Sequence, residues 1–295
     1  MRLAVFDRSH VGVVEGETIY DVSSAIPGIA DAWPPVFMNH LIARWDELKP
    51  RVLEARRAAK PVALDAVRLD APLPYPGTLV AAPANYRKHI GELGERGVTK
   101  AGHSANEIGF FLKAPASIVG PRGPIVLPQS RSRRFDHESE LAVIIGRTAK
   151  NVPKARALEH VFGYACLMDV TMRIEPGRPA EERPMRKSFD TFTPLGPWIV
   201  TADEIPDPQR LQNRLWVNGE LRQSASTSDM LVSVAELIEL ASSVMTLNPG
   251  DIIATGTPEG VGPIRPGDSV RMAIESVGEM ILGVKEADTA PPRLF

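Results

Sequence analysis

Residues 135–146 read FDHESELAVIIG and predict the strand around which the fold is built. The two-residue period of a strand places Glu138, Glu140, Ala142 and Ile144 on one face. Both faces are apolar at the far end, so we expect protein to cover the strand on both sides. Its two carboxylates would then repel each other unless a positive group lay between them. An isolated E-x-E can also mark a strand that emerges into solvent, so this alternative stays open here.

A second strand-like run, FGYACLMDV (162–170), contains Asp169 near its end. An aspartate this late in a buried strand is disfavoured unless it is paired or bound to a metal. Cys166 is the only cysteine, which excludes a thiolate metal cage. With Glu138 and Glu140, Asp169 would form an oxygen site suited to Mg²⁺, Mn²⁺ or Ca²⁺.

The segment NYRKHIGELG (85–94) contains a histidine and a glutamate three residues apart, His89 and Glu92. One turn of helix would bring both side chains onto one face, where the carboxylate could orient the imidazole. This spacing suggests a general base. Two surface residues on an ordinary helix would show the same spacing, so that alternative also stays open.

The composition indicates a globular protein. A chain of 295 residues with 43% hydrophobic content can bury a large core. The net charge of −2 is spread along the chain and leaves no basic surface for nucleic acid. No stretch is long and apolar enough to cross a bilayer, and the opening MRLAVFDRSH has no apolar signal segment. We therefore expect a cytoplasmic protein with no nucleic-acid or membrane partner.

Two domains are expected from the pattern of turns and apolar runs. Residues 1–71 contain three short strands and a helical stretch at 36–59, which predicts a small N-terminal α+β domain. The proline-rich linker APLPYPG (71–77) places the boundary near residue 72. Residues 72–295 then contain many short apolar runs separated by turns, which predicts a β-rich α+β core with a few packed helices.

Two local signals are specific enough to test. Asn218-Gly219 between two apolar runs predicts a β-hairpin. Ser233 and Glu236 form an S-x-x-E capping box ahead of an apolar helical pattern.

Nine motifs follow one another along the chain. They are NYRKHIGE (85–92), FFLKAPASIVGP (110–121), PIVLP (124–128), DHESELAVIIG (136–146), VFGYACLMDVTMR (161–173), RKSFDTFTPLGP (186–197), VNGELRQSASTSDM (217–230), LNPGDIIATGTPEGVG (247–262) and RPGDSV (265–270). Their order resembles that of the fumarylacetoacetate hydrolase superfamily, over roughly residues 76–287. The chain most resembles the branch of acylpyruvases, oxaloacetate decarboxylases and 2-hydroxyhepta-2,4-diene-1,7-dioate isomerases. The combination of motifs is specific, whereas any one of them would be weak.

The resemblance implies a mixed β-sandwich or roll for residues 72–295, with the small N-terminal domain attached. It implies that Glu138, Glu140 and Asp169 hold Mg²⁺ or Mn²⁺, with Ca²⁺ possible in crystals. The other roles that it implies are a water-activating pair, His89 and Glu92; a lysine near the reacting carbonyl, Lys187; and two substrate contacts, Arg173 and Thr257. Lys113 is expected to be structural.

The sequence departs from the family pattern in two places. The family often continues its aspartate motif as ARD-x-Q, whereas this chain reads MRIEP, so Pro176 occupies the place of a substrate-contacting glutamine. The segment from Glu92 to Phe110 is longer than in the small members, which predicts a differently shaped lid.

These features lead to a working hypothesis of a divalent-metal-dependent hydrolase. It would cleave a carbon–carbon bond in a 1,3-diketone or acylpyruvate-type 2-keto acid through a metal-stabilised enolate. The same site would also suit a decarboxylase, an isomerase or a sugar-acid dehydratase, and a non-catalytic metal-binding scaffold is a lesser alternative. The resemblance also implies a homodimer.

Overall fold

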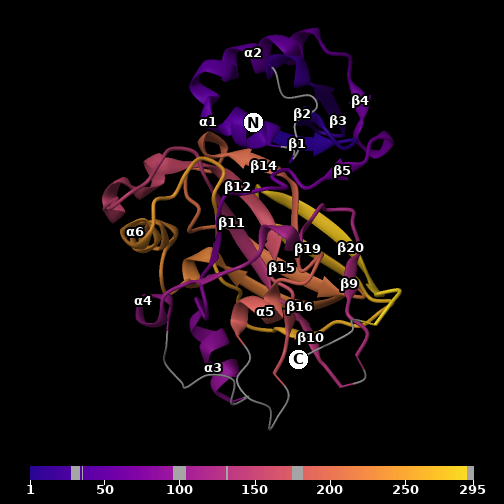
Figure 1. Ribbon diagram of the computed structural model, residues 1–295, viewed down its shortest axis with the longest axis vertical. Helices are drawn as coiled ribbons and strands as arrows, with labels where there is room; N and C mark the ends of the chain where they lie inside the picture. Colours follow the sequence, from indigo (N-terminus) through magenta and orange to yellow (C-terminus); the bar gives the residue numbers. More distant parts are fainter. Residues whose placement is uncertain (28–33, 35, 96–103, 131, 175–181, 291–295) are drawn as a thin grey trace.

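The computed structural model describes residues 1–27, 34, 36–95, 104–130, 132–174 and 182–290. A twelve-stranded sheet runs through these residues in the order β4-β3-β2-β1-β14-β12-β11-β17-β6-β7, with β5 attached to β1 and β8 to β14 (Figure 1). Its strands are β1 (Arg2–Phe6), β2 (His10–Glu15), β3 (Thr18–Asp21), β4 (Val62–Ala63), β5 (Leu69–Asp70), β6 (Leu79–Ala81), β7 (Phe111–Leu112), β8 (Ile118–Val119), β11 (Ser139–Ile145), β12 (Val161–Met168), β14 (Thr193–Thr201) and β17 (Ile252–Ala254).

Strand β11 lies inside this sheet, antiparallel to β12 on one side and to β17 on the other. Leu141, Val143 and Ile145 belong to one hydrophobic core, whereas Ala142 and Ile144 belong to another. All five side chains are fully buried. The alternation and the covering of both faces that the sequence predicted are therefore confirmed.

A five-stranded sheet covers one face of β11. Leu215, Met272 and Leu282 of this sheet pack in the same core as Leu141 and Val143. Its order is β16-β15-β19-β20-β9. The strands are β9 (Ile125–Leu127), β15 (Gln212–Val217), β16 (Glu220–Ser226), β19 (Ser269–Ile274) and β20 (Gly278–Glu286).

Two helices of the N-terminal segment, α1 (Phe37–Ala43) and α2 (Trp45–Ala58), contribute to the core on the other face. Leu41 of α1 and Leu48 and Val52 of α2 belong to the core that contains Ala142 and Ile144. The sequence predicted one continuous helical stretch over 36–59. The structure corrects this, because the backbone leaves the helical conformation at Arg44, which ends α1 and precedes α2.

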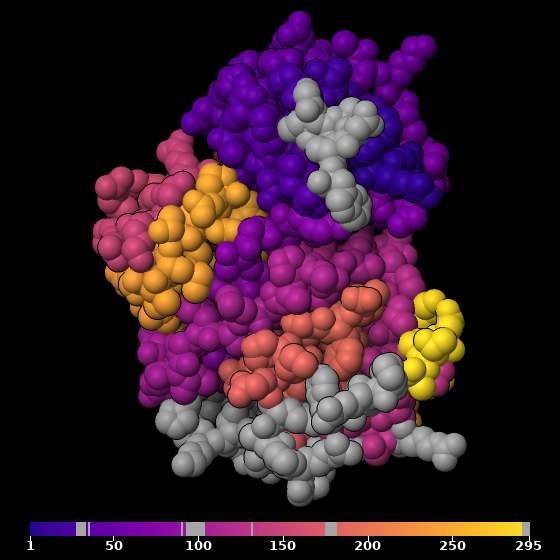
Figure 2. All heavy atoms as spheres, viewed as in Figure 1, coloured from indigo at the N-terminus to yellow at the C-terminus, as the bar shows by residue number. Residues whose placement is uncertain are grey.

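The N-terminal strands extend the large sheet, since β1 pairs with β14 through Arg2↔Val200 and Leu3↔Ile199. This segment, in indigo and purple, caps one end of the molecule in the space-filling view (Figure 2). The domain boundary near residue 72 stays a prediction.

Both local signals are confirmed. Asn218 and Gly219 have φ values of +52° and +82°, and they join β15 to β16 in the type of turn that suits a two-residue hairpin. The Ser233 hydroxyl accepts a hydrogen bond from the Glu236 backbone N–H, and the Glu236 carboxylate accepts one from the Ser233 N–H. This capping box starts helix α6 (Val234–Val244).

The remaining elements are short. A three-stranded sheet contains β10 (Phe135–His137), β13 (Thr171–Met172) and β18 (Gly262–Pro263). The other helices are α3 (Arg87–Glu95), α4 (Ala105–Ile108) and α5 (Arg183–Lys187), with 3-10 turns at Ser23–Ala25, Leu64–Ala66, Pro115–Ser117, Lys154–His160, Ala202–Glu204 and Thr227–Asp229. In the described part of the chain, no helix is long and apolar enough to span a membrane. The β-rich α+β fold with few helices is as predicted.

Candidate active site

The sheet topology brings four chain segments to one edge of the large sheet. Strand β11 starts at this edge, and its antiparallel neighbours β12 and β17 end there. Strand β6 is parallel to β17 and ends there as well. The residues before β11 and after β6, β12 and β17 therefore converge, although they are far apart in sequence.

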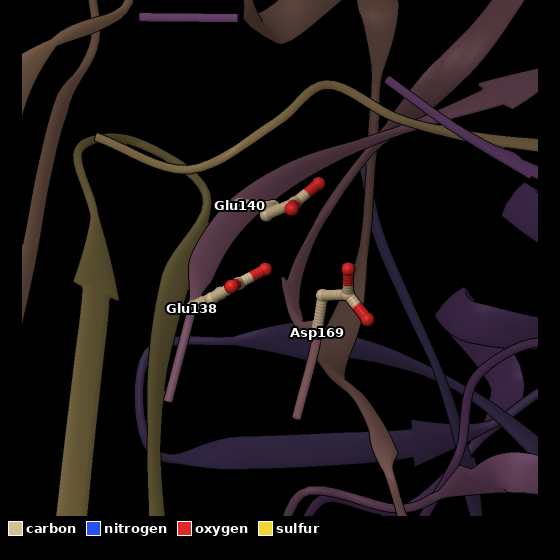
Figure 3. A group of neighbouring side chains, drawn as sticks. All are labelled: Glu138, Glu140 and Asp169. Atoms are coloured by element: carbon tan, nitrogen blue, oxygen red, sulfur yellow. The ribbon is translucent and has the colours of Figure 1, made fainter. Parts of the chain in front are cut away.

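Three carboxylates meet at this edge: Glu138, Glu140 and Asp169. One carboxylate oxygen of each residue lies within 4.8 Å of the other two, and the three side chains lie together where β11 starts and β12 ends (Figure 3). The Asp169 N–H donates to the Glu138 carbonyl at 2.8 Å, which extends the β11–β12 pairing to the site. All three residues are at most 5% exposed. The alternative of two solvent-exposed glutamates is therefore wrong.

Buried cations compensate two of these carboxylates. The Lys187 ammonium donates to Glu138 at 2.7 Å and also to Asp169. Arg173 donates to the other Glu138 oxygen at 2.6 Å, and Lys113 donates to Asp169. Burial alone would raise the pKa of Glu138, but Lys187 and Arg173 outweigh it and hold that pKa far below its ordinary value of 4.5.

Glu140 has a different environment. It accepts a hydrogen bond from the Gly256 backbone N–H at 2.7 Å, and no cation among the described residues forms an ion pair with it. Burial raises the pKa of Glu140 well above 4.5, and the neighbouring Asp169 and Glu138 raise it further. A buried carboxylate held against two others fits a divalent cation bound through oxygen ligands. The donor set therefore supports the predicted divalent-metal site.

The sequence assigned Lys113 a structural role, and the structure places it in the charge balance of the site. Its side chain is fully buried, and its ammonium contacts Asp169 and donates to the Phe192 carbonyl at 3.1 Å. Burial lowers the pKa of Lys113, while Asp169 opposes this shift. A lysine directly after the apolar run FFL was the available signal, because a buried lysine requires an anionic partner.

His89 and Glu92 lie on one side of α3, as predicted. His89 is 3% exposed, and its Nδ1 lies 3.3 Å from the Glu92 carboxylate. The other Glu92 oxygen accepts a hydrogen bond from the Gly260 N–H at 2.8 Å. Gly260 has a φ of +88°, and a Cβ there would lie 1.9 Å from the Arg222 carbonyl oxygen, so this close approach requires glycine. Glu92 thus connects α3 to the loop after β17.

Thr257, in the same loop, is positioned by Gln223 of β16. The Gln223 amide donates to the Thr257 hydroxyl and to the Pro258 carbonyl, both at 2.8 Å. Its oxygen accepts from the Ser139 N–H and from His137 Nδ1, both at 3.1 Å. These four contacts use both ends of the amide and fix its orientation. Because the Thr257 oxygen already accepts a hydrogen bond, its own proton remains available to a substrate.

Replacing Gln223 by methionine should destabilise the fold by about 2–4 kcal/mol, since several buried polar groups would lose their partner. The Thr257 loop and the start of β11 would also lose their connection, so KM should rise together with the loss of stability. Urea unfolding and steady-state kinetics would measure both effects. Gln212→Met, at an exposed position on β15, is the matched control and should change neither quantity. Equal stability of the two variants would contradict this role for Gln223.

Seven of the eight predicted site residues line a single pocket: His89, Glu138, Glu140, Asp169, Arg173, Lys187 and Thr257. The eighth, Glu92, contacts His89. Phe111, Arg183 and Arg186 also line the pocket, and the sequence analysis did not single them out.

Arg173 has a well-defined position beside the carboxylates. In addition to its contact with Glu138, it donates to Asp136 at 2.7 Å, and Asp136 also accepts from Arg134 at 2.6 Å. Asp136 is fully buried and fixes the Arg173 side chain. Pro176 and the lid residues 96–103 lie outside the described residues.

The chain is similar to known proteins over most of its length. Residues 78–285 match the family model described as fumarylacetoacetate (FAA) hydrolase C-terminal. A maleylpyruvate hydrolase from Aquipseudomonas alcaligenes is 42% identical over 291 residues, which cover 97% of this chain and 99% of that protein.

Two solved structures share the fold over almost the whole chain. The crystal structure of maleylpyruvate hydrolase from Sphingobium sp. SYK-6 in complex with manganese(II) ion and pyruvate has a TM-score of 0.86 and 42% identity, and covers 98% of this chain and 100% of its own. The 2-hydroxyhepta-2,4-diene-1,7-dioate isomerase from Mycobacterium marinum has a TM-score of 0.73 and 31% identity, with coverage of 98% and 100%. The predicted family and fold class are confirmed: the chain belongs to the fumarylacetoacetate hydrolase family.

Proposed function

We propose that this protein is a divalent-metal-dependent hydrolase that cleaves an acylpyruvate, such as maleylpyruvate, into pyruvate and a carboxylic acid. The predicted class of enzyme is confirmed by the full-length match to maleylpyruvate hydrolases. The observation that carries the proposal is the presence of three buried carboxylates and the His89–Glu92 pair at one edge of the sheet. This combination provides both a metal site and a base.

Glu138, Glu140 and Asp169 would hold the cation, and Mn²⁺ or Mg²⁺ suits their hard oxygen ligands. The Sphingobium relative binds manganese(II). When bound, the cation supplies Lewis-acid stabilisation of negative charge on the substrate oxygens. The further steps depend on side chains of this chain.

His89 takes the proton from the attacking water. In its neutral form, the imidazole donates its Nδ1 proton to Glu92, which leaves Nε2 free to accept a proton. The hydroxide adds to the carbonyl carbon farther from the pyruvate end. As the bond between that carbon and the neighbouring CH₂ breaks, its electron pair passes to the CH₂ carbon and forms the enolate of pyruvate. The proton that His89 took from water is then delivered to this carbon, which becomes the methyl group of pyruvate.

Lys187, Thr257 and Arg173 would position the substrate and stabilise charge. The Lys187 ammonium lies against Glu138 and Asp169, close to where negative charge develops. The Thr257 hydroxyl proton is free to bond a substrate oxygen, because Gln223 donates to the hydroxyl. Arg173 lines the pocket and is a candidate contact for the pyruvate carboxylate.

The alternative chemistries on this site differ in their need for water. Isomerisation, decarboxylation and dehydration do not require a water molecule to attack the substrate, whereas hydrolysis does. The identity of 42% to the maleylpyruvate hydrolases, against 31% to the Mycobacterium marinum isomerase, favours hydrolysis, and His89 with Glu92 is the base available to activate the water.

A homodimer is part of the proposal. One row of side chains crosses β16, β15, β19 and β20, and consists of Leu221, Trp216, Arg271 and Ile281 in that order. The two end residues, Leu221 and Ile281, are 50% and 58% exposed. Two exposed apolar side chains in one row of a sheet suit contact with a second copy. Light scattering would measure the molar mass in solution. The wild type should have the mass of two chains, and Ile281→Glu should lower it towards the mass of one.

Product analysis with Mn²⁺ or Mg²⁺ tests the proposed reaction. Maleylpyruvate, fumarylpyruvate, a monoacid acylpyruvate, oxaloacetate and a dienedioate form the panel. Metal-dependent release of pyruvate and an acid from an acylpyruvate, stopped by a chelator, is the expected result. Decarboxylation or isomerisation without hydrolysis would overturn the proposed reaction.

A further inference from the structure

The pocket is lined by cationic side chains as well as by carboxylates. Four cationic side chains line it: Arg173, Arg183, Arg186 and Lys187. Lys187 and Arg173 are paired with the acidic residues described above. Lys113, from outside the lining, adds a further positive charge at Asp169. A divalent cation at the three carboxylates would add two positive charges to this lining, so a substrate with more than one negative charge suits the pocket.

Arg183 differs from the other cations of the pocket. Its guanidinium lies over the Phe111 ring, 5.3 Å from the ring centroid, and it forms no ion pair with any described residue. A cation–π contact uses none of the guanidinium N–H groups as hydrogen-bond donors, and Arg183 donates to no other described residue, so these groups remain available to a ligand. Arg183 is therefore held in place while retaining the donors that a carboxylate needs.

The position of Arg183 relative to the metal carboxylates is set by α5. Lys187 is four residues later on the same helix, so both side chains project from one face. The Lys187 ammonium also lies 5.3 Å from the centroid of the Phe111 ring, and it contacts Glu138 and Asp169. Four residues of helix correspond to a rise of about 6 Å. This rise between Arg183 and Lys187 is comparable to the distance from the reacting carbonyl of an acylpyruvate to the far end of a short acyl chain.

Helix α5 lies on the surface of the molecule, where a bound substrate's far end would emerge. Figure 2 shows the segment around α5, in salmon, exposed on this face of the molecule. Arg183 itself is partly buried, whereas Lys187 at the other end of the helix is 6% exposed. The helix thus runs from the solvent side of the pocket to its carboxylate floor.

We propose that Arg183 binds the carboxylate at the far end of a dicarboxylate acylpyruvate and so makes the enzyme selective for diacids. This inference rests on the proposed hydrolysis of an acylpyruvate. Phe111 holds the guanidinium and gives the unsaturated chain of the substrate an apolar surface between the two charged ends. Arg183 is a specificity residue and takes no part in proton transfer.

The test compares Arg183→Met and Arg183→Lys with the wild type on two substrates. One is maleylpyruvate, and the other is an acylpyruvate of similar length whose far end is a methyl group. In Arg183→Met, the ratio of kcat/KM for the diacid to that for the monoacid should fall about 10- to 100-fold, mainly through KM for the diacid. Arg183→Lys should retain part of this preference, because it keeps the charge but loses the paired donors. Arg210→Met, at an exposed arginine paired with Asp207, is the matched control for the loss of one positive charge.

A binding measurement separates this inference from the proposed reaction. Calorimetry on the Mn²⁺-loaded protein would measure the Kd of maleate and the Kd of pyruvate. Arg183→Met should raise the Kd of maleate about tenfold or more beyond any change in the Kd of pyruvate. If Arg183→Met changes neither the ratio of kcat/KM for the two substrates nor the ratio of the Kd values of maleate and pyruvate, the role of Arg183 is refuted. If the wild type cleaves neither acylpyruvate but maleate binding still depends on Arg183, the proposed reaction fails and the carboxylate site remains.

Discussion

Replacing His89 by glutamine should lower kcat for acylpyruvate hydrolysis by about 10²- to 10⁴-fold, the usual contribution of a general base. Glutamine keeps a polar side chain in the buried position beside Glu92 but cannot accept the proton of water at neutral pH. Among the described residues, His89 forms no hydrogen bond or ion pair with the three metal carboxylates, so manganese affinity should stay within a few-fold of that of the wild type. Steady-state kinetics and calorimetric titration with Mn²⁺ would measure the two quantities.

His160→Gln provides the control, because this histidine is only half-buried and does not line the pocket. It should retain the activity of the wild type. Glu92→Gln should show an intermediate loss, since the imidazole would keep a hydrogen-bond partner but lose the carboxylate that stabilises its protonated form. If His89→Gln retained nearly full activity, another group would have to activate water.

Local sequence patterns were sufficient to predict the centre of this fold. The alternation along 139–145 correctly predicted a strand with two buried faces, because side-chain direction in a strand follows from the backbone alone. The Asn218-Gly219 hairpin and the Ser233 capping box were predictable for the same reason. Each of these features depends on residues within a few positions of one another.

Features that depend on distant residues were not predictable in the same way. Lys113 contacts Asp169 across 56 positions of sequence, and Gln223 contacts Ser139 across 84. Neither pairing leaves a periodic signal in the chain. Motif resemblance predicted which carboxylates belong together, whereas the side chains that neutralise and orient them required the three-dimensional arrangement.

The metal-free protein should become more stable when Glu140 is replaced by glutamine, although the same change should abolish tight metal binding. Because burial, Asp169 and Glu138 raise the pKa of Glu140, the protonated acid is favoured in the folded state. The associated stabilisation is complete below the ordinary pKa of 4.5 and is lost as the pH rises through the raised folded value. Glutamine has no such titration, so the variant should exceed the metal-free wild type by about 1–3 kcal/mol near pH 8.

Glu138→Gln provides the matched contrast, because the two glutamates are two positions apart at the start of β11 but differ in their partners. Removing the Glu138 charge leaves Lys187 and Arg173 with one anionic partner fewer, and breaking a buried pair of this kind costs about 3 kcal/mol or more. Metal-free Glu138→Gln should therefore be less stable than the wild type, opposite in sign to Glu140→Gln.

Both variants should lose the stabilisation of about 2.7 kcal/mol that Mn²⁺ at a hundred times its Kd gives the wild type. Chemical denaturation at pH 5 and pH 8, with and without Mn²⁺, would measure these differences. Destabilisation of both metal-free variants by the same amount would mean that Glu140 is compensated within the protein, and the charge argument for a cation at this position would fail.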